Sequence, residues 1–150
     1  MKYRTLSEIR PSEFRRIATA KPAVLRRRRL ERFADLLEDH AGPIRLFSAI
    51  EHISSRRRQT MRRDSSPFSI AFADSVFRAD GLASDTVGDG ASFFGLSSWE
   101  THELVCDCHY FGPVNGRAVA ERARHIAAHP SLASRFRDFM GDVMAWRASA

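Results

Sequence analysis

The sequence predicts an all-α protein that folds as a single compact domain of five or six helices spanning residues 1–150. Three observations support this fold class. Apolar residues recur at helical spacing in several segments, Pro, Gly and capping residues separate those segments at short intervals, and no internal repeat or linker divides the chain. A chain of 150 residues is also long enough to bury a core without disulfides or metal.

The first third of the chain predicts three helices. Ser12 is placed to cap a short helix that ends near Ala18. A second helix starts at Pro22, a residue tolerated in the first helical turn, and stops before the Gly42–Pro43 pair. The predicted buried face of the second helix comprises Leu30, Phe33, Ala34 and Leu37. The predicted buried face of the third comprises Leu46, Phe47, Ile50 and Ile53.

The middle of the chain allows two interpretations. Residues 68–72 alternate between apolar and polar like a strand, whereas Phe72, Val76 and Phe77 share one face of a helix. Short apolar runs do not distinguish a strand from a helix by periodicity alone. A small β-hairpin around residues 67–78 is therefore an alternative to helix there.

A further helix is predicted from Trp99 to about Tyr110. Ser97 and Glu100 have the spacing of a capping box, in which a side chain at each position bonds the backbone of the other. The predicted core face of this helix comprises Leu104, Val105, Cys108 and Phe111.

Two more helices complete the predicted fold. Asn115 caps one, and its face comprises Val119, Ala123, Ile126 and Ala127. Ser131 caps the last, and its stripe comprises Leu132, Phe136, Phe139, Met140 and Val143. We expect the stripes at residues 30–37, 46–53 and 132–143 to pack into one core.

Charge is distributed unevenly along the chain. Residues 1–63 hold 17 Arg or Lys against 7 Asp or Glu, a balance of +10. Residues 64–150 hold 7 against 11, a balance of −4, which makes a basic N-terminal half and a mildly acidic C-terminal half. Such asymmetry predicts a basic surface for an anionic partner.

The predicted nucleic-acid-binding residues are arginines in two clusters. They are Arg26, Arg27, Arg28, Arg29, Arg56, Arg57, Arg58, Arg62 and Arg63. Residues 26–29 are consecutive and spread over about 300° of a helix, so we expect this turn to project from the core. The sequence thus favours a non-enzymatic protein that binds nucleic acid, as a regulator or accessory factor. The alternative is an adaptor whose arginines bind an acidic protein.

A second alternative is a metal- or thiol-dependent protein. On one helix His102, Cys106 and His109 would share a face, and this donor set suits zinc. The Cys-x-Cys-His spacing at residues 106–109 is not a usual zinc motif, however, and no cofactor is the default expectation. A cysteine nucleophile is disfavoured because both cysteines are expected in mid-helix, away from an N-terminus that would lower a thiol pKa.

Cys106 and Cys108 are too close in sequence for a stabilising disulfide, which indicates free thiols and a reducing compartment, the cytoplasm. No run approaches the ~20 apolar residues of a membrane span, so no membrane partner is expected. The first residues lack the apolar run of a secretory signal. The sequence does not predict an oligomeric state.

Overall fold

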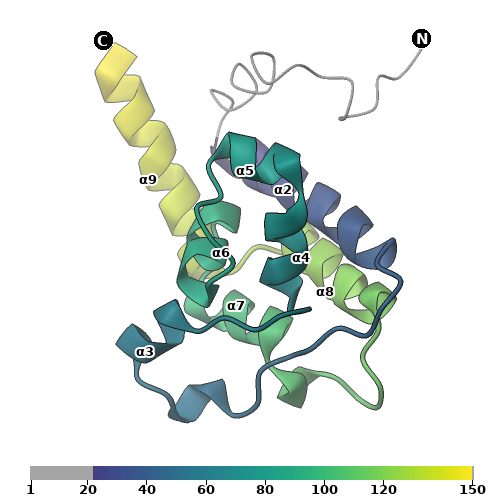
Figure 1. Ribbon diagram of the computed structural model, residues 1–150. Coiled ribbons are helices and arrows are strands. Elements are labelled where there is room, and N and C mark those ends of the chain that lie inside the picture. Colours follow the sequence, from purple (N-terminus) through teal and green to yellow (C-terminus); the bar gives the residue numbers. More distant parts are fainter. Residues whose placement is uncertain (1–21, 150) are drawn as a thin grey trace, which may run out of the picture.

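The computed structural model of the protein describes residues 22–149. Within this range eight α-helices and two short 3-10 helices follow one another, which confirms the all-α class with more helices than expected (Figure 1). No β-strand forms between residues 22 and 149, where one isolated parallel bridge joins Phe47 to Cys106. The short helix expected between Ser12 and Ala18 lies outside the described residues.

Helices α2 (Pro22–Glu38) and α8 (Gly116–Ala128) pack along each other at the centre of the fold. The predicted faces are confirmed, since every residue proposed for each of the two stripes is buried. Gly116 allows the close approach at one end, because a Cβ atom there would lie 1.8 Å from the Leu37 carbonyl oxygen. Asn115 caps α8 as expected by accepting from the Ala118 backbone N–H.

Residues 67–78 are helical, so the hairpin alternative is wrong. Helices α4 (Pro67–Ala73) and α5 (Ser75–Asp80) meet at Asp74, and α6 (Val87–Phe94) follows. The large aromatic residues of this region therefore pack into a core between helices rather than against one face of a sheet. Aromatic side chains that stack or meet edge to face in that core are Phe33, Phe68, Phe77, Phe93 and Phe94.

The helix expected over residues 46–53 does not form. The segment runs extended through Phe47, whose N–H donates to the Val105 carbonyl over 2.8 Å while its own carbonyl accepts from the Asp107 N–H over 3.0 Å. Only the 3-10 helix η2 (Ile50–His52) follows, before α3 (Ser55–Thr60). Leu46, Phe47 and Ile50 are nevertheless buried, because tertiary contacts rather than helical periodicity hold them in the core.

Helix α7 (Ser98–Val105) begins with the predicted capping box and ends earlier than expected. Cys106 adopts an extended backbone that pairs with Phe47, and this bridge stops the helix one residue before it. The 3-10 helix η3 (Asp107–His109) then turns the chain. The predicted core face is therefore only half right: Leu104 and Val105 are buried, whereas Cys108 and Phe111 are exposed.

Helix α9 (Leu132–Ser149) extends away from the other helices, as the yellow ribbon of Figure 1 shows. Its apolar stripe does not join the core: Phe136 is 66% exposed and Phe139 is 61% exposed. The prediction that residues 132–143 pack with the other stripes is thus wrong. Among the α9 residues whose burial the structure describes, Ser134 is the buried one, and its hydroxyl bonds to the buried Glu100 carboxylate.

No helix within residues 22–149 combines the length and the apolar character that crossing a bilayer requires.

Candidate metal centre

Five side chains of types that can bind metal ions lie close together where η2, α7 and η3 meet. His102 lies on α7, Cys106 follows its last turn, and Cys108 and His109 lie on η3. Glu51 comes from η2, which follows the extended segment that the Phe47–Cys106 bridge fixes beside the end of α7. The early end of α7 is therefore what creates the cluster, because a continuous helix would have turned Cys108 to another face.

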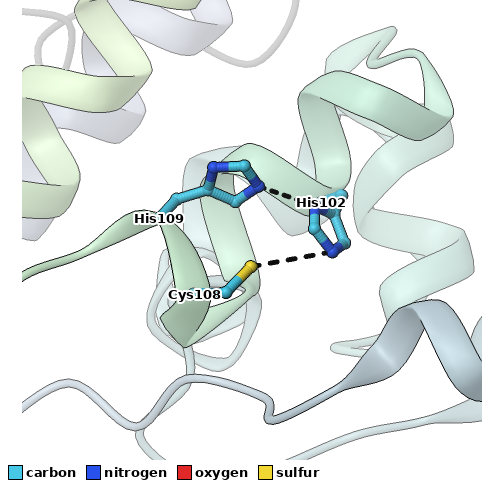
Figure 2. Close-up of side chains that lie close together, drawn as sticks. All are labelled: His102, Cys108 and His109. Carbon is cyan, nitrogen blue, oxygen red and sulfur yellow. Dashed lines mark hydrogen bonds between the residues drawn. The ribbon is translucent and has the colours of Figure 1, made fainter.

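His102 stands at the middle of the cluster and uses both ring nitrogens (Figure 2). Its Nδ1 lies 2.7 Å from Nε2 of His109, and its Nε2 lies 3.9 Å from Sγ of Cys108. The same Nε2 lies 3.2 Å from a carboxylate oxygen of Glu51. If Nδ1–H donates to His109, the lone pair on Nε2 is directed at Cys108 and Glu51.

The two thiols lie against each other on the other side of this imidazole. Cys108 Sγ donates to Cys106 Sγ over 3.1 Å, and Cys106 Sγ lies 3.9 Å from Glu51 Oε2. Donor atoms lie within 4.8 Å of one another in two groups that share His102. The groups are His102, Cys108 and His109, and Glu51, His102 and Cys106.

The structure partly reproduces the predicted triad of His102, Cys106 and His109. The two histidines do meet, and Cys106 does lie near His102, but as members of different groups. Sequence analysis missed Cys108, which it assigned to the core, although Cys-x-Cys-His was a visible signal. It also missed Glu51, which no sequence pattern indicates, because only the tertiary bridge brings η2 to this site.

Neighbouring side chains hold the cluster in place from both sides. Arg122 donates to the His109 carbonyl over 2.8 Å, and the Tyr110 hydroxyl donates to the Leu104 carbonyl over 2.8 Å. Trp99, although 60% exposed, stacks on His102 with ring centroids 5.8 Å apart. The imidazoles are thus restricted before any ligand binds.

Three groups of the cluster have shifted pKa values. The hydrogen bond with Cys106, followed by desolvation and the negative charge of neighbouring groups, raises the pKa of the exposed Cys108 thiol to about 11, which keeps this thiol protonated in the absence of a metal. Burial and the neighbouring His102 lower the pKa of His109, which keeps its ring neutral and able to accept a hydrogen bond from His102. Backbone hydrogen bonding and then His102 lower the pKa of Glu51, so its carboxylate is ionised.

A cleft of about 450 Å³ opens beside the cluster, between α3, α6 and α7. His102 belongs to both the cluster and the cleft wall, and Arg58 and Arg137 lie on the same wall. The cleft thus gives solvent access to the His102 side of the cluster.

The predicted arginine clusters lie on separate parts of the fold. Residues 26–29 are on α2 and residues 56–58 are on α3, which Figure 1 shows well apart. We expected the turn at residues 26–29 to project from the core, and this is wrong for Arg26. Its side chain is buried and pairs with Glu100 over 2.8 Å. Arg29 bonds Asp80 over 2.7 Å and lies over the Phe93 ring.

The remaining predicted arginines differ in how accessible they are. Arg27, Arg28, Arg56 and Arg57 are exposed, and Arg27 pairs with Glu31 within α2. Arg62 pairs with both Asp64 and Asp85. Two others donate to backbone carbonyls: Arg58 to Ile53 and Arg63 to Leu46. Of the nine, therefore, Arg28, Arg56 and Arg57 have exposed guanidinium groups without a hydrogen-bond partner among residues 22–149.

Comparison of the chain with protein-family models, with curated proteins and with solved structures found no match in any of the three.

Proposed function

We propose that the protein binds a divalent transition-metal ion of the zinc class through Glu51, His102, Cys106 and Cys108. The observation that carries the proposal is a closed chain of four donor atoms in which each lies within 3.9 Å of the next: two sulfurs, one imidazole nitrogen and one carboxylate oxygen. Successive separations around it are 3.1 Å (Cys106–Cys108), 3.9 Å (Cys108–His102), 3.2 Å (His102–Glu51) and 3.9 Å (Glu51–Cys106).

Each of these separations lies within about 0.2 Å of the range that tetrahedral zinc coordination requires, but none lies inside it. Bonds of about 2.0–2.3 Å from zinc to N, O and S place tetrahedral donors about 3.3–3.8 Å apart. Mixed thiolate, imidazole and carboxylate ligands suit zinc better than Mg²⁺ or Ca²⁺, which prefer oxygen alone. One ion would bind all four donors after side-chain rotations that bring Cys108 and Glu51 closer together, because these two do not share a group of donors within 4.8 Å of one another.

His109 positions the imidazole ligand in this proposal. Metal-bound histidines usually donate their second ring N–H to a fixed acceptor, and His109 Nε2 is 2.7 Å from His102 Nδ1. The ion would join η2 to η3, two segments that are otherwise connected by the Phe47 bridge and the hydrogen bond from Ser48 to Asp107. The ligand thiols must stay reduced, because a Cys106–Cys108 disulfide would remove two ligands, and this requirement supports a reducing compartment such as the cytoplasm.

Metal content of the full-length protein and its variants tests the proposal. The purified chain is expected to hold about one equivalent of zinc, and Cys106→Ser or Cys108→Ser is expected to abolish tight binding. His109→Ala is expected to weaken binding by about 10–100-fold without abolishing it. His125→Ala is the matched control, because this exposed histidine on α8 stacks on His129 away from the cluster.

Two results would count against this ligand set. A wild-type chain that shows no saturable zinc binding under reducing conditions would exclude the site. Binding that survives Cys106→Ser but is lost in His109→Ala would instead assign the ion to His102, Cys108 and His109.

We also propose that exposed arginines of α3 bind nucleic acid through its phosphates. Arg56 and Arg57 support this proposal, because both are exposed and neither has a carboxylate partner among residues 22–149. Phosphate contacts of this kind position a protein without reading sequence. The same two side chains would serve an adaptor that binds an acidic protein, and salt-dependent binding to DNA or RNA separates the two functions.

A further inference from the structure

Helix α9 exposes its apolar face and turns its small and polar residues toward the other helices, the opposite of what a helix in a monomer normally does. The side toward the other helices carries small or polar residues: Ser134 is buried, and a Cβ atom on Gly141 would lie 3.0 Å from the Pro22 ring. The opposite side carries Leu132, 81% exposed, together with the exposed Phe136 and Phe139. A single helix normally buries its apolar stripe and exposes its polar face.

The spacing of the exposed stripe is that of a coiled-coil seam. Leu132, Phe136, Phe139 and Val143 follow one another at intervals of four, three and four residues. The helix is 18 residues long, so at about 1.5 Å per residue it extends about 27 Å. Among the residues that the structure describes, no element covers this seam.

We infer that α9 pairs with α9 of a second copy of this chain, in antiparallel orientation. In an antiparallel pair, residue numbers rise along one helix while those of the facing residues fall along the other. The register that sets Phe136 against the partner's Phe139 therefore also sets Leu132 against the partner's Val143. All four seam residues then face an apolar residue of the partner helix, and the two-fold symmetry of the pair repeats each contact.

Charges that flank the seam support a second copy as the occupant. In the same register Arg135 faces the partner's Asp142, and the symmetry repeats the contact at the other end of the pair. Arg135 and Asp142 are both exposed, and neither has an ion-pair partner among residues 22–149. A parallel pair would also join opposite charges, Asp142 and Arg147, but it would set Arg135 against the apolar Met140.

Sedimentation of the full-length protein at several concentrations measures the pairing, which is independent of the metal centre. The wild type is expected to be a dimer, and Phe136→Asp combined with Phe139→Asp is expected to be a monomer with unchanged helix content. Arg135→Asp creates two like-charge contacts and is expected to raise the dimer dissociation constant about tenfold or more. Asp142→Arg is expected to do the same, and Arg135→Asp with Asp142→Arg to restore the wild-type value.

Arg147→Asp is the matched control, since it changes the same charge on the same helix but faces no partner charge in the antiparallel register. A wild type that stays monomeric at millimolar concentration would overturn the inference and assign the stripe to another ligand. A dimer that Arg147→Asp weakens and Arg135→Asp does not would overturn the antiparallel direction. Failure of the double charge exchange to restore pairing would overturn the assigned register.

Discussion

Arg26 on α2 and Glu100 on α7 form a buried ion pair across 74 residues of sequence, with Nη2 donating to Oε1 over 2.8 Å. The same carboxylate accepts from the Ser97 N–H and so closes the capping box of α7. It also accepts from the Ser131 N–H, at the start of α9. One carboxylate thus fixes the beginnings of two helices against the side of a third.

Replacing Arg26 tests how much of the fold depends on this pair. Arg26→Met is expected to destabilise the protein by about 3–5 kcal/mol, because it leaves the Glu100 carboxylate buried without a counter-charge. Arg28→Met, two residues away and exposed, is expected to change stability by no more than about 0.5 kcal/mol. Urea unfolding of both variants measures the difference, and equal stabilities would show that the pair contributes little.

The pKa of Glu100 gives a second prediction. Burial raises this pKa, but several hydrogen bonds and one charge lower it by more, so that its net shift is downward from 4.5. The groups that lower it are the Ser131 N–H, the Ser134 hydroxyl, the Ser97 N–H and the Arg26 guanidinium.

A carboxyl whose folded pKa lies below its unfolded pKa stabilises the protein above the unfolded pKa. That stabilisation is lost as the pH falls through the folded value. The unfolding free energy of the wild type is therefore expected to exceed that of Glu100→Gln at pH 7 and to approach it near pH 3. Denaturant titrations at both pH values measure the gap, and a gap independent of pH would contradict the assignment.

The aromatic core gives a third prediction with a built-in control. Phe94 is fully buried, stacks on Phe33 with ring centroids 4.5 Å apart and meets Phe77 edge to face. Phe94→Ala is expected to cost about 3–5 kcal/mol through lost transfer energy and the cavity left behind. Phe111→Ala removes a ring that is 99% exposed and is expected to cost less than about 0.5 kcal/mol. Thermal unfolding distinguishes the two, and similar losses would show that Phe111 is covered in solution.

The sequence correctly predicted the helices that are fixed by contacts between residues close together in the chain. The stripes of α2 and α8, the Asn115 cap and the Ser97–Glu100 capping box all appear as expected. In each case side chains a few residues apart fix both the helix and its start, and such patterns are visible in sequence.

Predictions failed where long-range contacts override periodicity. The bridge between Phe47 and Cys106 replaces two expected helical segments with extended backbone, and no sequence spacing signals it. The same bridge brings Glu51 to His102, so a donor of the candidate site was missed for the same physical reason. Arg26 was expected outside the core because its turn is charged all round, and its burial depends on Glu100 lying 74 residues away.

The last prediction concerns nucleic acid. If Arg56 and Arg57 contact phosphates, the logarithm of affinity should fall linearly with the logarithm of salt concentration, by about 0.9 per phosphate on duplex DNA. Replacing both with Gln should weaken binding to all sequences about equally and reduce the slope by about 2, since each lost contact removes about one unit. Arg117→Gln is the control, because this exposed arginine pairs with Glu121 on α8. Binding at low salt to neither DNA nor RNA would reject the proposal, and salt-sensitive binding to an acidic protein alone would favour the adaptor.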